Sequence, residues 1–229
     1  MSTITSAGEL VSTDAMHPLA RLGTALELLL VYAGLLFYIW QWQFTRPRMW
    51  MLLFAAVLFS HVFHRDTLRS LGLTVANLRL NATLVLPLAL SLYLPVLVFG
   101  LARRGLVLAL PGRQAFLWFF GYGSWCVFQQ YLMQSYFHNR MMEIIRNRHV
   151  TSLMIAIMFG GAHIPNPILM IVTTLGGFAL AEVFARHRNI WPLALAQTVG
   201  GLLVAAIAPA SLIHNMRVGP GYFFFRIRG

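Results

Sequence analysis

The sequence is poor in charge. Of its 229 residues only 10% are Asp, Glu, Lys or Arg, whereas 59% are apolar. A soluble globular domain has roughly 25% charged and about 45–50% apolar residues. This deficit over the whole chain excludes a soluble enzyme, a disordered chain and an ordinary nucleic-acid-binding protein. It predicts an all-α, polytopic bundle of transmembrane helices.

Cysteine and lysine are almost absent. The chain has one cysteine, Cys126, which lies in an apolar run, and it has no lysine. One cysteine cannot form a disulfide within the chain, so we interpret Cys126 as a small buried hydrophobic residue. The 17 basic residues are therefore all arginines, and with 6 acidic residues they give a net charge of +11. Because they lie in short gaps between apolar runs, we expect them to face anionic lipid headgroups.

The apolar runs predict seven membrane spans, or eight if the C-terminal tail re-enters the membrane. The expected spans are residues 22–44, 49–63, 82–102, 115–138, 151–162, 168–184 and 190–213. We predict a polar N-terminal segment 1–20 without signal-peptide features, a helical bundle 21–215 and a basic, aromatic tail 216–229. The arginines divide almost equally between the two sides, so the positive-inside rule does not set the topology.

Polar residues within the spans are the most informative ones, because an unsatisfied amide in hydrocarbon costs roughly 2–7 kcal/mol. Two interpretations stay open: the amides join neighbouring helices through hydrogen bonds, or they line a common polar pocket. The polar set consists of Gln129, Gln130 and Gln134 on the fourth span, His163 and Asn166 at the break after the fifth, and Gln197 on the last.

The order and spacing of these residues resemble the CPBP family of intramembrane proteases, which contains the CAAX prenyl endopeptidases and the bacterial Abi proteins. That family has paired glutamates with an Arg four residues later, then Phe-x-x-x-His, then His-x-x-x-Asn. The corresponding segments are Gln129-Gln130-Tyr-Leu-Met-Gln134, Phe159-Gly-Gly-Ala-His163 and Gln197-Thr-Val-Gly-Gly201. The resemblance covers about residues 60–205 and implies a helical intramembrane core.

Only the middle motif keeps its residue types. The resemblance implies that the first glutamate and the central His activate water, while the last His and Asn hold the oxyanion. Gln129 has no titratable group, so it cannot be a general base or an anionic metal ligand. We therefore expect His163 to be the only catalytic residue if any activity remains. The expected pocket-lining residues are Gln129, Gln130, Gln134, Phe159, Asn166, Gln197 and Gly201, and no metal site is expected.

We consequently predict a non-proteolytic pseudoenzyme that acts as a binding or assembly subunit of a membrane complex. The alternative is an active CPBP-type intramembrane endopeptidase that uses His163. A transporter would need an acid at mid-membrane, for which only Glu27 and Glu182 qualify, and such charges require a partner. The expected partners are the lipid bilayer and other integral membrane proteins, not nucleic acid. The expected location is the inner (cytoplasmic) membrane of a bacterium, and the sequence indicates no particular cofactor.

Two further histidines, His61 and His64, lie three residues apart at the end of the second span. They could bind a metal ion or a tetrapyrrole as a pair. Because no third ligand accompanies them, we favour an ordinary position at the membrane interface.

Overall fold

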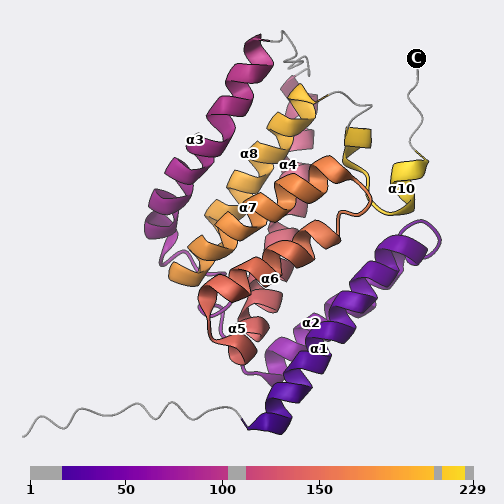
Figure 1. Cartoon of the computed structure of the whole chain (residues 1–229), viewed down its shortest axis with the longest axis vertical. Helices are drawn as coiled ribbons and strands as arrows, with labels where there is room; N and C mark the ends of the chain where they lie inside the picture. The colour runs from indigo at the N-terminus through magenta and orange to yellow at the C-terminus, as the bar shows by residue number, and fades with distance from the viewer. Residues whose placement is uncertain (1–16, 103–111, 209–212, 225–229) are drawn as a thin grey trace, which may run out of the picture.

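The structure, a computed structural model, describes residues 17–102, 112–208 and 213–224, and every regular element within these ranges is helical (Figure 1). The predicted all-α membrane architecture is confirmed. Most of the predicted N-terminal segment 1–20, the final residues 225–229 of the predicted tail and residues 209–212 of the predicted last span lie outside the described ranges.

Eight α-helices of at least seven residues and an eight-residue π-helix make up the described bundle, and shorter helical turns connect some of them. In chain order the elements are α1 (Pro18–Phe37), the π-helical turn η1 (Tyr38–Trp42), η2 (Pro47–Met49), α2 (Trp50–Phe63), α3 (Leu78–Ala102), α4 (Gly112–Gln130), the π-helix η3 (Tyr131–His138), α5 (Asn139–Ile145), α6 (Arg148–Gly161), α7 (Pro167–Arg186), α8 (Ile190–Ile207), η4 (His214–Met216) and α10 (Pro220–Phe223).

Four of the described helices are long and apolar enough to cross a membrane: α1 with η1, α3, α7 and α8. The predicted span 49–63 is a shorter apolar helix, Pro47–Phe63. The predicted span 115–138 lies within the consecutive helices α4 and η3. The predicted span 151–162 corresponds to α6, which has 14 residues. Seven crossings therefore stay a prediction, since only four helices meet the criteria of length and hydropathy.

The starts of the last three long helices follow from the sequence, because an asparagine precedes each of them. The side chains of Asn147, Asn166 and Asn189 accept hydrogen bonds from the first backbone N–H groups of α6, α7 and α8. These groups have no partner within the helix, and such a cap contributes about 1 kcal/mol. Asn166 also ends the predicted break after α6, where Pro167 begins α7.

The polar segment 64–77 crosses the end of the bundle and docks on the turn between α7 and α8. Gly72 adopts a positive φ of 69°, and its carbonyl oxygen accepts a hydrogen bond from the backbone N–H of Ile190. A Cβ atom at this position would lie 2.7 Å from the ring of Phe184, so both backbone conformation and space require glycine. Asn81 strengthens the contact by donating to the carbonyl oxygens of His187 and Asn189.

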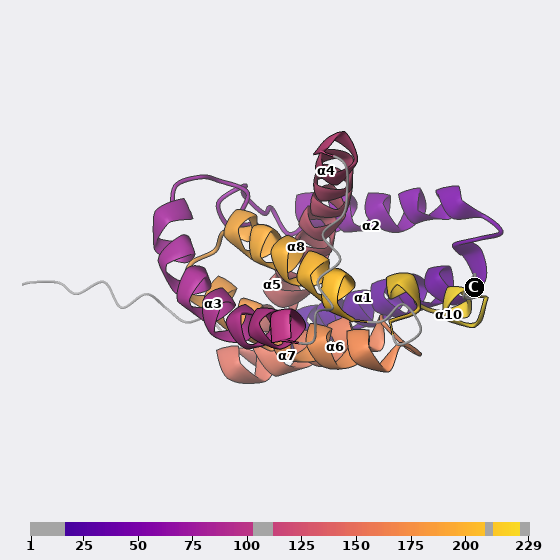
Figure 2. The ribbon, with the colours of Figure 1, turned by 90° about the horizontal axis from the view of Figure 1, so that it is seen from above.

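The bundle has two apolar cores. One joins α1, α2, η3 and α6 through residues such as Val57, Tyr136 and Phe159, and the other joins α3, α7 and α8 around Phe184 and Leu193. Figure 2 shows α1 and α2 on one side of the bundle and α3 and α8 on the other, with α4 between them. The end of α4 therefore lies where the two halves meet.

Candidate functional site

Three glutamines from α4 and α8 form one chain of hydrogen bonds between the two halves. Gln130 donates through Nε2 to Oε1 of Gln197 at 2.6 Å, and Gln197 donates through Nε2 to Oε1 of Gln129, also at 2.6 Å. The residues that correspond to the first and third motifs thus meet in space. In this series of hydrogen bonds each amide donates to the next, from Gln130 through Gln197 to Gln129. Nε2 of Gln129 and Oε1 of Gln130 stand at its two ends and have no partner among the described residues.

His163 lies just beyond the C-terminal end of α6 and is held by its own helix. Its Nδ1 lies 2.7 Å from the carbonyl oxygen of Phe159, and the rings of these two residues pack edge to face with centroids 5.0 Å apart. A carbonyl oxygen only accepts hydrogen bonds, so Nδ1 carries the proton and Nε2 of the neutral ring presents a lone pair. His163 is therefore oriented by the backbone of the Phe-x-x-x-His motif itself.

Two apolar cavities meet at these residues. Cavity 1, of about 640 Å³, lies between α1, α2 and α4, and cavity 2, of about 360 Å³, lies between α3, α4, α7 and α8. Both are lined by Trp125, Gln129, Phe159 and His163, while Gln197 and Gly201 line cavity 2. The polar groups on the side chains of the shared wall are Nε2 of Gln129 and the indole N–H of Trp125, which can donate, and Nε2 of His163, which can accept; the surroundings are mostly apolar.

Three of the predicted pocket residues, Gln130, Gln134 and Asn166, do not line either cavity. Gln134 is completely buried, and neither its amide oxygen nor its nitrogen has a partner among the described residues. The Asn166 side chain donates instead to the carbonyl oxygens of Ile213 and Arg217 in the C-terminal segment.

Gly201 stands where the third motif of the resembling family has Asn, and a tyrosine occupies the adjacent space. A Cβ atom at Gly201 would overlap the hydroxyl oxygen of Tyr122 and would lie 2.7 Å from two carbons of its ring. A larger side chain at position 201 would therefore require Tyr122 to move. Of the two positions that the resemblance implies for oxyanion binding, the space beside Gly201 is thus filled by a ring from α4.

The described carboxylates are all engaged away from the cavities. Glu27, Asp66 and Glu143 belong to one cluster around Arg140, and Glu182 pairs with His149 at 3.0 Å. Glu9 and Asp14 lie outside the described residues. Within the described ranges no group of three His, Cys, Asp or Glu side chains is suited to holding a metal ion.

The Arg140 cluster links α1, α2, the segment 64–77 and α5, and sequence reasoning did not identify it. The Arg140 side chain has no exposed surface; its guanidinium contacts Asp66, donates to Glu143 at 2.9 Å and lies 3.7 Å from Glu27. Arg140 also donates to Oγ and the carbonyl oxygen of Ser60, at 3.0 and 3.2 Å. The charge of Glu27 within a predicted span was the available signal, because it required a partner.

The two histidines at the end of α2 serve this cluster. His61 contacts Asp66 through Nδ1 at 2.7 Å. His64 lies between two carboxylates, with Nε2 3.1 Å from Glu27 and Nδ1 3.2 Å from Glu143, and both contacts are hydrogen bonds only if the ring is protonated. The pKa of Asp66 is raised by burial but lowered by more through its hydrogen bonds from Arg140 and His61, so it lies below its ordinary value.

Comparison with known proteins gives one match. Residues 111–203 match the family model described as Type II CAAX prenyl endopeptidase Rce1-like. A search of curated proteins and a search of solved structures found no match. The matched region contains all three motifs on which the predicted resemblance depends, so that resemblance is confirmed. The chain is an integral membrane protein with an Rce1-like region.

Proposed function

We propose that this Rce1-like membrane protein is a non-proteolytic subunit that binds an apolar chain inside the bilayer and presents it within a membrane complex. We place it in the inner membrane of a bacterium, in line with the predicted location. The observation that carries the proposal is that no described carboxylate lies at the cavities. Each described carboxylate is paired with a basic residue elsewhere. The positions that correspond to the family's glutamates hold glutamines, whose amides form hydrogen bonds with Gln197.

Hydrolysis needs a base that takes a proton from water and a donor that stabilises the oxyanion. Among the described residues that line the cavities, His163 is the one histidine and there is no carboxylate, and Gln129 can orient a water molecule but cannot take its proton. The resemblance implies two positions for oxyanion stabilisation: Gln197, whose amide nitrogen already donates to Gln129, and Gly201, which has no side chain and faces Tyr122. When several members of a catalytic unit are missing, only a residual rate from binding is left.

The two cavities, in contrast, have the size and lining of ligand-binding sites. Ligand sites typically occupy about 300–1,000 Å³ and combine apolar walls with a few polar groups, and both cavities fall within that range. The donor on Gln129 and the acceptor on His163 suit a neutral polar group, such as an ester or a hydroxyl. The two cavities together therefore suit a molecule with an apolar chain and an uncharged polar group near one end.

Three glycines allow a matched test of binding. A Cβ atom would meet nothing within 4 Å at Gly23, Gly121 or Gly176, so each position accepts a larger side chain. Gly121 lines cavity 1 and Gly176 lines cavity 2, whereas Gly23 on α1 lines neither. We expect Gly121→Leu or Gly176→Leu to weaken binding of a phospholipid with a fluorescent acyl chain by tenfold or more, and Gly23→Leu to leave it unchanged.

The assay uses purified full-length protein in detergent, with thermal unfolding to confirm that each variant folds. Equal binding by Gly23→Leu and both cavity variants would overturn the binding proposal. Because leucine favours helix more than glycine, none of the three substitutions is expected to unfold its helix.

A second function is favoured by one observation, the lone pair on Nε2 of His163 at the wall of both cavities. It is an intramembrane endopeptidase activity of the kind named in the family description. The test is a peptide with a prenylated CAAX end, incubated with the wild type and with His163→Ala. We expect no cleavage by either protein. Cleavage that His163→Ala abolishes would contradict the non-proteolytic assignment and leave the binding result intact.

A further inference from the structure

The C-terminal segment folds back onto the turn between α1 and α2. Gln43 donates from Nε2 to the carbonyl oxygen of Val218 at 3.3 Å, and the rings of Phe44 and Phe224 lie edge to face with centroids 6.2 Å apart. Gly221 is buried, and a Cβ atom there would lie 2.9 Å from the Phe44 ring. Two segments far apart in sequence thus form one surface, and Figure 1 shows α10 beside the end of α1.

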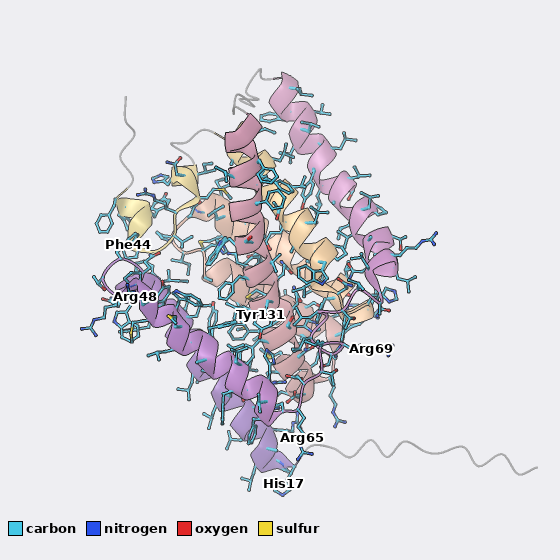
Figure 3. The ribbon with its side chains drawn as sticks, turned by 180° about the vertical axis from the view of Figure 1, so that it is seen from behind. His17, Phe44, Arg48, Arg65, Arg69 and Tyr131 are labelled. Atoms are coloured by element: carbon cyan, nitrogen blue, oxygen red, sulfur yellow. The ribbon has the colours of Figure 1, made fainter. Side chains whose placement is uncertain are left out.

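This surface, which we call the basic rim, is rich in exposed arginine and phenylalanine. Its members are Phe44, Arg46, Arg48, Arg217, Phe223 and Phe224, all of them exposed. The described carboxylates belong to other parts of the chain: Glu27 lies within α1, Asp66 follows α2, and the other two are on α5 and α7. In Figure 3, Phe44 and Arg48 lie beside the C-terminal helix, whereas His17, Arg65 and Arg69 lie towards the opposite end.

The basic rim adjoins cavity 1. Gln43, which precedes Phe44, and Val218, which follows Arg217, both line that cavity. Tyr38 and Ile39, one turn earlier on η1, line it as well. A chain lying in cavity 1 would therefore extend towards the arginines of the rim.

The rim also lies at the end of a candidate membrane span, which runs from Pro18 to Trp42. The residues directly after a span lie at the level of the lipid headgroups, where aromatic side chains are preferred. A basic group at that level attracts anionic lipid by about 1 kcal/mol, which is roughly a fivefold change in affinity. The planar guanidinium of arginine binds phosphate through paired hydrogen bonds, and phosphate is the anionic group that phospholipid headgroups share.

We propose that the ligand of cavity 1 is a phospholipid with an anionic headgroup, whose phosphate is bound by Arg46, Arg48 and Arg217 while one acyl chain enters the cavity. This inference rests on the proposed function for the chain, but it adds the headgroup class and the residues that select it. Selection by charge takes place at the rim, because the wall shared by the two cavities offers only neutral polar groups.

The test measures retention of lipids that differ only in headgroup. The full-length protein is titrated in detergent with phosphatidylglycerol and phosphatidylcholine of identical acyl chains, and bound lipid is counted by native mass spectrometry. The rim variant is Arg46→Gln, Arg48→Gln and Arg217→Gln combined. The matched control, Arg69→Gln, Arg79→Gln and Arg186→Gln combined, removes the same charge from exposed arginines outside the rim.

We expect the wild type and the control to prefer phosphatidylglycerol by more than tenfold, and the rim variant to bind both lipids equally. A rim variant that keeps the preference, or a control that loses it equally, would overturn the inference. Glycerol phosphate without acyl chains provides a third arm, and competition by it at the lipid's own concentration would also overturn the proposal. The cavity variants distinguish failure of this inference from failure of the proposed function. If Gly121→Leu alone retains both lipids like the wild type, the assignment of the ligand to cavity 1 fails; if Gly176→Leu does so as well, the proposed function fails, whatever the headgroup preference.

Discussion

Removal of the Arg140 side chain is expected to cost more stability than removal of any exposed arginine. In Arg140→Met the apolar part of the side chain is largely replaced, while the guanidinium and its hydrogen bonds are lost. Those bonds connect α2, the segment 64–77 and α5 through Ser60, Asp66 and Glu143. The substitution therefore tests whether the cluster holds this end of the bundle together.

The magnitude follows from the exposure of the carboxylates left behind. Breaking a buried ion pair from one side costs about 3–5 kcal/mol, because the remaining charge is uncompensated. The Glu27 and Glu143 side chains are 25% and 30% exposed, so water compensates part of their loss. Asp66 is only 11% exposed and bears most of the cost, although it keeps His61. We therefore expect a loss of about 3 kcal/mol, at the lower end of the range.

The measurement is the free energy of unfolding in mixed detergent micelles, with Arg69→Met as the control. Arg69 is exposed, and substitutions at such sites usually change stability by less than about 0.5 kcal/mol. The double variant Arg140→Met, Asp66→Asn should regain about 1 kcal/mol or more, since the neutral amide removes the uncompensated charge. Equal stabilities of Arg140→Met and Arg69→Met would refute the reasoning, and so would strictly additive losses in the double variant.

Three further predictions concern single positions. The pKa of Asp66 is lower in the folded state than in the unfolded chain. Its stabilising contribution is therefore complete above about pH 4 and is lost as the pH falls through the pKa of the folded state. Measurement of the unfolding free energy against pH should show this loss in the wild type but not in Asp66→Asn. Gly201→Ala should cost about 1–3 kcal/mol by crowding Tyr122, and in thermal unfolding Tyr122→Leu should relieve that cost. Asn166→Ala removes a helix cap and two hydrogen bonds to the C-terminal segment, so it should cost about 2 kcal/mol. It should also make the C-terminal segment sensitive to limited proteolysis, and unchanged cleavage would contradict the role of Asn166 in holding that segment.

The helices were predictable because hydrophobic runs and caps are local properties of the sequence. The runs 82–102 and 168–184 correspond to α3 and α7, each extended by a few residues, and proline marks the break at 165–167. The number of crossings was harder to predict, since α6 has only 14 residues, half of which are buried among its neighbours. Its burial depends on α7, against which Gly160 and Gly177 allow close packing, and that is a property of the fold.

The candidate site was predictable in part. The motif order placed Gln129, Gln130 and Gln197 together, and the structure joins them through hydrogen bonds. Their role as a site stays a prediction. Gln134 was expected in the same pocket because it follows Gln130 by four residues, but it lies one turn farther along the helix and away from both cavities. The position of a cavity depends on side chains from several helices, so spacing on one helix could not reveal it.

The sequence signalled the Arg140 cluster only through Glu27 and did not reveal its other members. Glu27 required a partner, but its contacts come from Ser60, His64 and Tyr136, which are 33 to 109 residues away along the chain. Local patterns carry no information on such pairings. Several Arg and His residues in the connecting segments were equally good candidates, and the fold selects among them by position.

The arrangement of charged and neutral polar groups is the physical basis of the proposed function, binding without proteolysis. The three glutamines are neutral and form hydrogen bonds with one another, so they need no counter-ion in the wall of an apolar cavity. A carboxylate at position 129 would need one. The arginines that could supply it are elsewhere: Arg140 is saturated by three carboxylates, and those of the basic rim are exposed. Restoring a glutamate at position 129 alone would therefore create an unpaired charge rather than a catalytic base. The neutral wall suits the uncharged part of a lipid, and the rim suits its phosphate, so both parts of the proposed ligand find groups of matching polarity.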